Sequence, residues 1–147
     1  MIEIIQMDEA WTGRVAELEK VCFSTPWSEQ SIAQELHNPL SLWLLAVEGE
    51  SLAGYVGSQT VMGETDMMNL AVAPQRRRQG IGRRLVEELT ARLARMGSRS
   101  LTLEVRASNA PARALYEAMG FVQTGLRRGY YRSPREDGLI LRKEWTI

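Results

Sequence analysis

A short glycine-containing loop between an apolar strand and an amphipathic helix constrains the fold of this chain more than any other feature. The apolar run Met67–Val72 leads towards the loop, Arg77–Arg83, and Ala73-Pro74 stops the strand. After the loop, apolar residues recur at helical spacing until Gly97, namely Ile81, Leu85, Leu89, Leu93 and Met96. The rest of the chain is placed relative to this strand, loop and helix.

The loop itself predicts a site for a phosphate-bearing ligand. Gly80 and Gly82 let the backbone bend and approach a ligand closely, and the free N–H groups of a helix start attract anions. No Lys-Ser/Thr pair follows the glycines, and Leu85 stands where a dinucleotide fingerprint has a third small residue. On the loop alone, an ordinary strand-to-helix turn with basic residues remains an open alternative.

Hydrophobic periodicity predicts the other elements. Strands are expected at Ile2–Met7, Leu42–Val47, Leu52–Val61, Leu101–Val105, Phe121–Leu126 and Leu139–Trp145. Helices are expected at Ala10–Cys22, after the cap candidate Ser28, and from Asn109 to Gly120. A polar loop, Arg127–Gly138, is expected between the last two strands. This order predicts an α/β (α+β) fold in a single domain over 1–147, with a mixed sheet and helices on both faces.

Composition excludes several classes of function. The chain has 147 residues, 18 basic and 18 acidic side chains and a net charge of zero, so its overall field does not favour a polyanionic partner. One cysteine, Cys22, and one histidine, His37, cannot form a disulfide or a Cys/His zinc site, and no metal is expected. Without a long apolar run or a signal-peptide pattern, no membrane association is expected and the predicted location is cytoplasmic.

Three side chains in the second half of the chain suggest acid–base chemistry. Glu104 interrupts a strand otherwise suited to burial, and Asn109 and Tyr116 follow in the next helix, seven residues apart and therefore on one face. A carboxylate, an amide and a phenol are thus predicted to converge beside the end of the strand. Each has a structural alternative: an exposed edge glutamate, a helix cap and a packed core tyrosine.

The same segment resembles the RimI family within the GNAT acetyltransferases. The strings that carry the resemblance are Leu103–Asn109, Ala114–Glu117, Met119–Phe121, Asn69–Val72, Arg78–Arg83, Pro26–Ser28 and Arg127–Tyr131. The resemblance implies a GNAT fold, with about seven mostly antiparallel strands splayed in the middle of the sheet. It also implies acetyl-coenzyme A as co-substrate and the N-terminal alanine of small-subunit ribosomal protein eighteen as acceptor.

The resemblance further implies roles for individual residues. Glu104 is the expected general base and Tyr116 the expected general acid. The residues expected to bind the cofactor are Leu70, Ala71, Val72, Arg77, Arg78, Gln79, Gly80, Ile81, Gly82, Arg83 and Asn109. Those expected to contact the incoming peptide are Phe23, Trp27, Asn69, Tyr130 and Tyr131.

Two other functions stay open from the sequence. One is a GNAT enzyme with another amine acceptor, such as lysine, a polyamine or a free amino acid. The other is a non-catalytic module that binds coenzyme A or RNA. Arg76–Arg78 could contact RNA phosphates, but no stacking aromatics are interleaved with them, so no direct nucleic-acid contact is expected. The sequence does not determine the oligomeric state.

Overall fold

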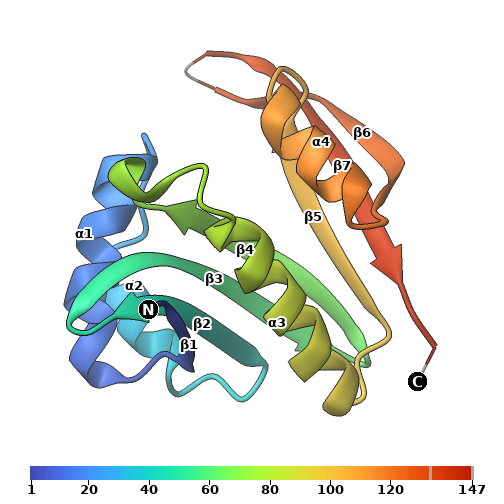
Figure 1. Cartoon of the computed structure of the whole chain (residues 1–147). Helices are drawn as coiled ribbons and strands as arrows, with labels where there is room; N and C mark the ends of the chain where they lie inside the picture. The colour runs from blue at the N-terminus through green and yellow to red at the C-terminus, as the bar shows by residue number, and fades with distance from the viewer. Residues whose placement is uncertain (133, 147) are drawn as a thin grey trace.

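A computed structural model of the chain describes residues 1–132 and 134–146. Seven strands form one sheet in the order β1-β2-β3-β4-β5-β7-β6 (Figure 1). The strands are β1 (Glu3–Gln6), β2 (Ser41–Glu48), β3 (Ser51–Val61), β4 (Glu64–Val72), β5 (Ser100–Arg106), β6 (Val122–Tyr131) and β7 (Glu136–Glu144). The α-helices are α1 (Thr12–Cys22), α2 (Glu29–Glu35), α3 (Ile81–Arg95) and α4 (Ala110–Ala118), with short 3-10 helices at η1 (Glu9–Trp11) and η2 (Pro74–Arg76). None of the described helices has the length and apolar character needed to cross a lipid bilayer.

Side-chain caps start the helices where the sequence predicts them. Asp8 accepts a hydrogen bond from the Ala10 amide (2.9 Å) ahead of the first helical turn. The Ser28 hydroxyl accepts from the Ser31 amide (3.1 Å) at the start of α2, and Asn109 caps α4 in the same manner. These bonds satisfy amides that have no partner inside the helix, so local sequence decides where each helix begins.

The sheet splits between β4 and β5, as the resemblance to the GNAT fold implies. All neighbouring strands pair antiparallel except these two, which run parallel. Their pairing covers only Glu64–Asp66 against Ser100–Thr102. Beyond these positions the two strands diverge and leave a V-shaped separation (Figure 1). We call the region between Asn69–Val72 and Leu103–Arg106 the gap.

A one-residue bulge in β4 controls which side chains face each side of the sheet. Asn69 pairs with Gly57 and Met67 pairs with Ser58, so Met68 is an extra residue. Since strand side chains alternate, one extra residue reverses the faces that follow it. Met67, Leu70 and Val72 accordingly pack on the α3 side, whereas Ala71 packs on the α1 side. The bulge therefore turns Asn69 towards the side of α1.

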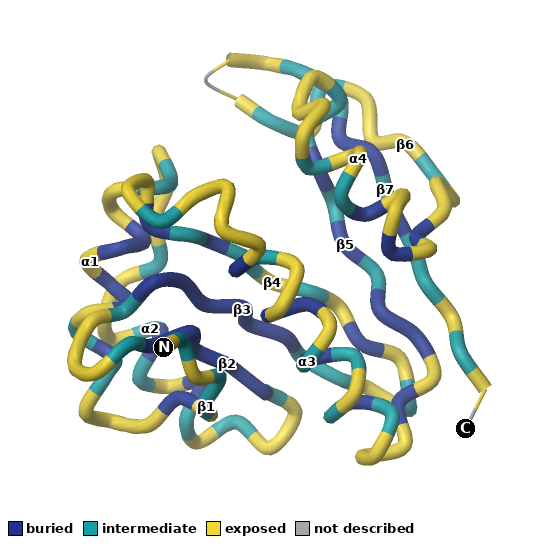
Figure 2. Tube along the Cα trace, viewed as in Figure 1, coloured by how far each residue is buried: buried dark blue, intermediate teal, exposed yellow. Residues whose placement is uncertain are grey.

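Two apolar cores lie on opposite faces of the sheet, so the prediction of helices on both faces is confirmed. Side chains of α3 and α4 pack with one face, and side chains of α1 and α2 pack with the other. The middle parts of β2 and β3 are buried between these layers, whereas most of β6 is exposed (Figure 2). The face of β5, β7 and β6 opposite α4 carries Glu104, which belongs to neither core.

The prediction of a polar loop over Arg127–Gly138 is wrong, because most of this segment forms strands. Strand β6 continues to Tyr131, and β7 starts at Glu136. As an edge strand with mostly exposed side chains, β6 can carry polar residues without burying them, so the hydrophobic alternation that identifies a strand is absent. Tyr130 and Tyr131 consequently stand on a strand and are not part of a loop.

Candidate active site

One edge of the gap is formed by backbone polar groups of β4. The Ala73 amide donates to the Ala53 carbonyl (2.8 Å). In an antiparallel pair, every second residue hydrogen-bonds to the neighbouring strand. Ala71 is two residues before Ala73, so its peptide groups also point towards β3. The peptide groups of Leu70 and Val72 face the gap instead. The backbone groups of Ala71 therefore face β3, whereas those of Leu70 and the Val72 amide are directed at the gap.

The start of α3 presents an unpaired set of backbone amides. The first bond inside the helix runs from the Arg84 amide to the Gly80 carbonyl (3.0 Å), which leaves the amides of residues 80–83 without helical acceptors. Gly80 has φ +76°, a left-handed conformation that suits glycine. A pocket of about 210 Å³ lies over these amides and is lined by Val72, Arg76, Arg77, Arg78, Gly80, Ile81, Gly82, Arg83 and Leu115. Amides and guanidinium groups together suit an anion.

Arg77 reaches back to β4 from this loop. Its Nε donates to the Val72 carbonyl (3.2 Å), and its guanidinium lies 3.8 Å from Sγ of Cys22 on α1. The gap-facing carbonyl of Val72 therefore already has a partner in the protein. Because a carbonyl oxygen has two lone pairs, Val72 has a second acceptor position beside the Arg77 bond.

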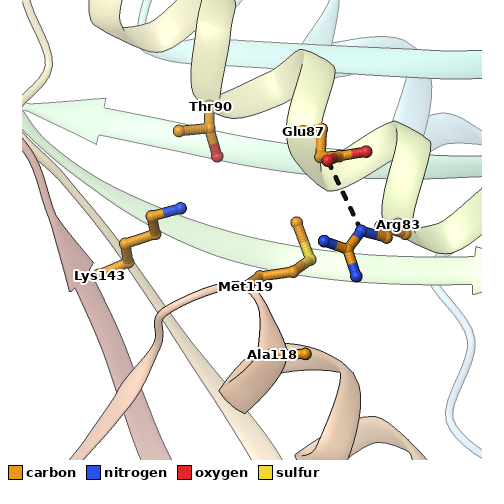
Figure 3. Close-up of a pocket in the computed structure, with 6 residues that line it drawn as sticks. All are labelled: Arg83, Glu87, Thr90, Ala118, Met119 and Lys143. Atoms are coloured by element: carbon orange, nitrogen blue, oxygen red, sulfur yellow. Dashed lines mark ion pairs between the residues drawn. The ribbon is translucent and has the colours of Figure 1, made fainter.

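A second groove lies between α3 and α4. It has a volume of about 250 Å³ and is lined by Arg83, Glu87, Thr90, Ala118, Met119 and Lys143. Figure 3 shows the Arg83–Glu87 ion pair (3.6 Å) on α3 and Lys143 extending from β7 on the other side. Arg83 lines both the loop pocket and this groove, so the two spaces adjoin at its side chain.

Glu104 lies at the other edge of the gap, on β5. Its neighbours Leu103 and Val105 are buried under α3 and α4, so the glutamate faces the opposite side of the sheet. Oε1 pairs with Nε of Arg127 (3.2 Å), and the buried Oε2 has no hydrogen-bond partner among the described residues. Arg127 was not identified from the sequence as a partner of Glu104. The two residues come together because β7 lies between β5 and β6 in the sheet, and this strand order is set by tertiary pairing.

Two tyrosine rings lie beside Glu104 on the same face. Tyr130 and Tyr131 meet edge to face at 5.1 Å, and the Arg106 guanidinium stacks on Tyr131 at 4.5 Å. Burial, followed by the charge of Glu104, raises the pKa of Tyr131 to about 12. Gly138 of β7 lies under both rings, and a Cβ there would come within 3.2 Å of Tyr131. The glycine therefore allows the rings to fold over the sheet.

Tyr116 approaches the gap from the other face. It is buried on α4 with its ring edge on Phe121 (5.4 Å), and its hydroxyl lies 4.0 Å from the sulfur of Met67 on β4. Burial raises the pKa of Tyr116 well above the usual value for tyrosine. Tyr116 and Glu104 thus flank β5 from opposite faces, so the two side chains approach the gap from different sides of the sheet.

The sequence and fold match a known family. Residues 12–121 match the Acetyltransferase (GNAT) family. The chain belongs to this family. This GNAT protein is 40% identical over 126 residues to the [ribosomal protein bS18]-alanine N-acetyltransferase of Escherichia coli K12, covering 84% of each chain. It is 38% identical to the N-alpha-acetyltransferase RimI of Mycobacterium tuberculosis, covering 97% of this chain and 92% of that one.

A solved structure supports the same assignment. The crystal structure of the ribosomal-protein-S18-alanine N-acetyltransferase from Escherichia coli superposes with a TM-score of 0.93 at 34% identity, covering 100% of this chain and 96% of that chain. The resemblance to the RimI family and to the GNAT fold is therefore confirmed.

The remaining predicted site residues of this GNAT protein lie on the C-terminal side of α1 and at the start of α4. Phe23 and Trp27 follow α1 and are half-buried on the α1 side of the sheet, where Trp27 meets Trp43 edge to face at 5.4 Å. Asn109 is exposed at the start of α4, and its Oδ1 is already bonded to the Ala112 amide. Among the described residues, no group of three or more His, Cys, Asp or Glu side chains is placed to hold a metal ion.

Proposed function

We propose that this protein transfers the acetyl group of acetyl-coenzyme A to the N-terminal α-amine of a protein, with the N-terminal alanine of ribosomal protein S18 as the acceptor. One observation carries the proposal: the pocket over the free amides of α3 borders the gap at β4 on one face of the sheet, and the carboxylate of Glu104 borders it at β5 on the opposite face. A donor and an acceptor can meet from opposite sides of such a gap. The function places the protein in the cytoplasm, where ribosomal proteins are synthesised.

The residues of the α3 face fit acetyl-coenzyme A. The amides of residues 80–83 and the surrounding arginines suit its diphosphate. The peptide groups of Leu70 and Val72 suit the amides of its pantetheine arm, as in the addition of a strand to an open sheet edge. The co-substrate supplies an acetyl thioester, and the protein supplies the binding groups and the proton transfers.

On the opposite face, Glu104 is the base of the proposed reaction. The amine nitrogen forms a bond to the acetyl carbon while the carbon–sulfur bond breaks, and Oε2 of Glu104 takes the proton that the nitrogen loses, directly or through a water. A free α-amine has a pKa of about 8, whereas lysine has one of about 10.4. An N-terminal amine therefore requires less help from the base than a lysine does.

Tyr116 is the acid that protonates the departing sulfur. Its hydroxyl lies by the gap on the donor face, and its raised pKa keeps the proton available at neutral pH. Sulfur accepts this proton as the carbon–sulfur bond breaks. The proton held by Glu104 then returns to solvent, and Tyr116 takes up a proton from solvent, so both groups regain their starting states. The transfer is direct and needs no covalent enzyme intermediate.

Tyr116→Phe is expected to lower kcat by about 10²-fold, since it removes only the donated proton. The hydroxyl's sole described contact is a weak one with the Met67 sulfur, so the melting temperature and the affinity for coenzyme A should change little. In the wild type, the raised pKa predicts no loss of activity from Tyr116 ionisation up to pH 10. Rates measured by thiol release from pH 6 to 10 test both points, and equal rates for the two proteins across this range would count against Tyr116 as the acid.

Gly138→Ala is expected to raise the KM for the acceptor peptide several-fold, because the added Cβ displaces the rings of Tyr130 and Tyr131. The affinity for acetyl-coenzyme A, measured by calorimetry, should stay the same. Gly125→Ala is the matched control, since its Cβ is as crowded (3.1 Å) but only against the end of the Ile140 side chain. An equal rise in KM for both variants would show that the tyrosines have no special part in acceptor binding.

The proposed function is tested by acetylation of a peptide that begins with the mature S18 N-terminal alanine. Acetylation and release of free thiol are expected with this peptide and not with the same peptide blocked at its N-terminus. Transfer to the blocked peptide through an internal lysine, or to free amino acids or polyamines in preference to the peptide, would instead indicate a GNAT enzyme with another acceptor. Coenzyme A binding without thiol release for any amine would indicate a non-catalytic module.

A further inference from the structure

Glu19 on α1 is a fully buried carboxyl group that the reaction described above does not use. Its Oε1 accepts a hydrogen bond from Nδ2 of Asn69, while Oε2 has no partner within the described part of the chain. Burial raises the pKa of Glu19, and the Asn69 amide, the Tyr55 hydroxyl and the Trp27 backbone amide lower it to a smaller extent. An apolar side chain would fill such a site at less energetic cost. Packing alone therefore does not account for a glutamate at this position.

The partner of Glu19 lies at the edge of the gap. Continuing the parallel register beyond Asp66 and Thr102, and allowing for the extra residue at Met68, brings Asn69 level with Glu104. Both side chains face the α1 side of the sheet. Asn69 is only partly buried, unlike Glu19. The two residues thus flank the gap from β4 and β5 on the face that opens to an acceptor.

The hydrogen bond to Glu19 sets the orientation of the Asn69 amide. When Nδ2 donates to a buried carboxyl oxygen, Oδ1 must point the other way, and no described residue donates to Oδ1. A glutamine at position 19 could either donate or accept, so it would hold the asparagine amide in either orientation. The ionised carboxylate of Glu19 can only accept, so it favours the single orientation in which Asn69 offers an acceptor oxygen to a ligand.

We infer that Glu19 is a positioning residue of the acceptor site: it holds Asn69 so that Oδ1 accepts a hydrogen bond from the α-amine of the incoming peptide. This inference rests on the proposed function. Asn69 on one edge of the gap and Glu104 on the other then contact different N–H groups of the same amine. The amine is held between two oxygen acceptors, and Glu104 takes the proton.

The test uses Glu19→Gln, Asn69→Ala and the double variant in the full-length protein, with the S18 peptide as acceptor. Asn69→Ala is expected to raise the KM for the peptide about tenfold, the effect of losing one hydrogen bond. Glu19→Gln, which leaves the Asn69 amide free to adopt either orientation, is expected to raise it about two- to tenfold. For both variants kcat and the affinity for acetyl-coenzyme A should stay within about twofold of the wild type. Since Glu19 acts through Asn69, the double variant should have the KM of Asn69→Ala alone. An unchanged KM for Glu19→Gln, or effects that multiply in the double variant, would overturn the inference.

Glu35→Gln is the matched control, because Glu35 is the other buried glutamate but bonds Ser41, Trp43, Gln59 and Asn38. It should lower the melting temperature without changing KM, and an equal rise in KM would show a general effect of destabilisation. If Glu19→Gln does not fold, Asn69→Ala by itself decides the question, since an unchanged KM overturns the role of Oδ1. A wild type that acetylates no α-amine defeats the proposed function, whereas an active wild type with an unaffected Glu19→Gln defeats only this inference.

Discussion

Glu104→Gln is expected to lower kcat by about 10²- to 10⁴-fold while leaving the affinity for acetyl-coenzyme A unchanged. The substitution keeps the shape of the side chain and removes its capacity to take a proton. It also removes the ion pair with Arg127, whose side chain is 55% exposed. A pair of this kind contributes at most about 1 kcal/mol, so the loss of activity cannot result from unfolding.

Calorimetry with acetyl-coenzyme A and steady-state kinetics with the S18 peptide separate binding from chemistry for this variant. Glu64→Gln is the matched control, because Glu64 is also on the sheet and also pairs with an arginine, Arg142 (2.9 Å), but lies where β4 and β5 are still joined. The control should retain wild-type kcat. Full activity of Glu104→Gln would remove Glu104 as the base.

Gly82→Leu is expected to weaken the binding of acetyl-coenzyme A by at least about 10²-fold, the loss of one or two charge-assisted hydrogen bonds to the diphosphate. The backbone tolerates a side chain here, since a Cβ at Gly82 would lie 3.7 Å from Val72, an ordinary contact. Leucine also has a higher helix propensity than glycine, by about 0.8 kcal/mol. The free protein should therefore be as stable as the wild type or more stable, although its cofactor pocket is blocked.

Ala91→Leu adds the same side chain to an exposed position of α3, away from the loop pocket, and should leave the cofactor affinity unchanged. Gly82→Ala provides an intermediate case, with a smaller loss than leucine. Thermal melting and calorimetry on the three variants give the comparison. Wild-type affinity in a well-folded Gly82→Leu protein would mean that the start of α3 does not hold the diphosphate.

Several parts of the fold were predictable because they depend on neighbours in sequence. The caps at Asp8, Ser28 and Asn109 act within three residues, and the apolar stripe of α3 follows from its own 3.6-residue period. The loop at the start of α3 was recognised from its two glycines. These signals are local, so sequence alone carries them.

Other parts of the candidate site depend on contacts that no local pattern encodes. The bulge at Met68 reverses the faces of β4 and so determines the direction of Asn69, but it arises from pairing with β3. Arg127 meets Glu104 only because β7 lies between β6 and β5 in the sheet. The extent of β6 was missed because an exposed edge strand needs no hydrophobic alternation.

The sequence by itself determined the order of the elements and the fold class. It also predicted an anion-binding loop and, through its resemblance to a family, the residues of interest. Only the tertiary structure decided on which face of the sheet each of those residues lies. Glu104 and Asn69 face one side of the gap and Tyr116 the other, because strand pairing, a one-residue bulge and the early divergence of β4 from β5 set these directions. Helix and strand periods are local properties of a chain. The position of one strand beside another, and so the face on which each side chain lies, is set only when distant segments pair.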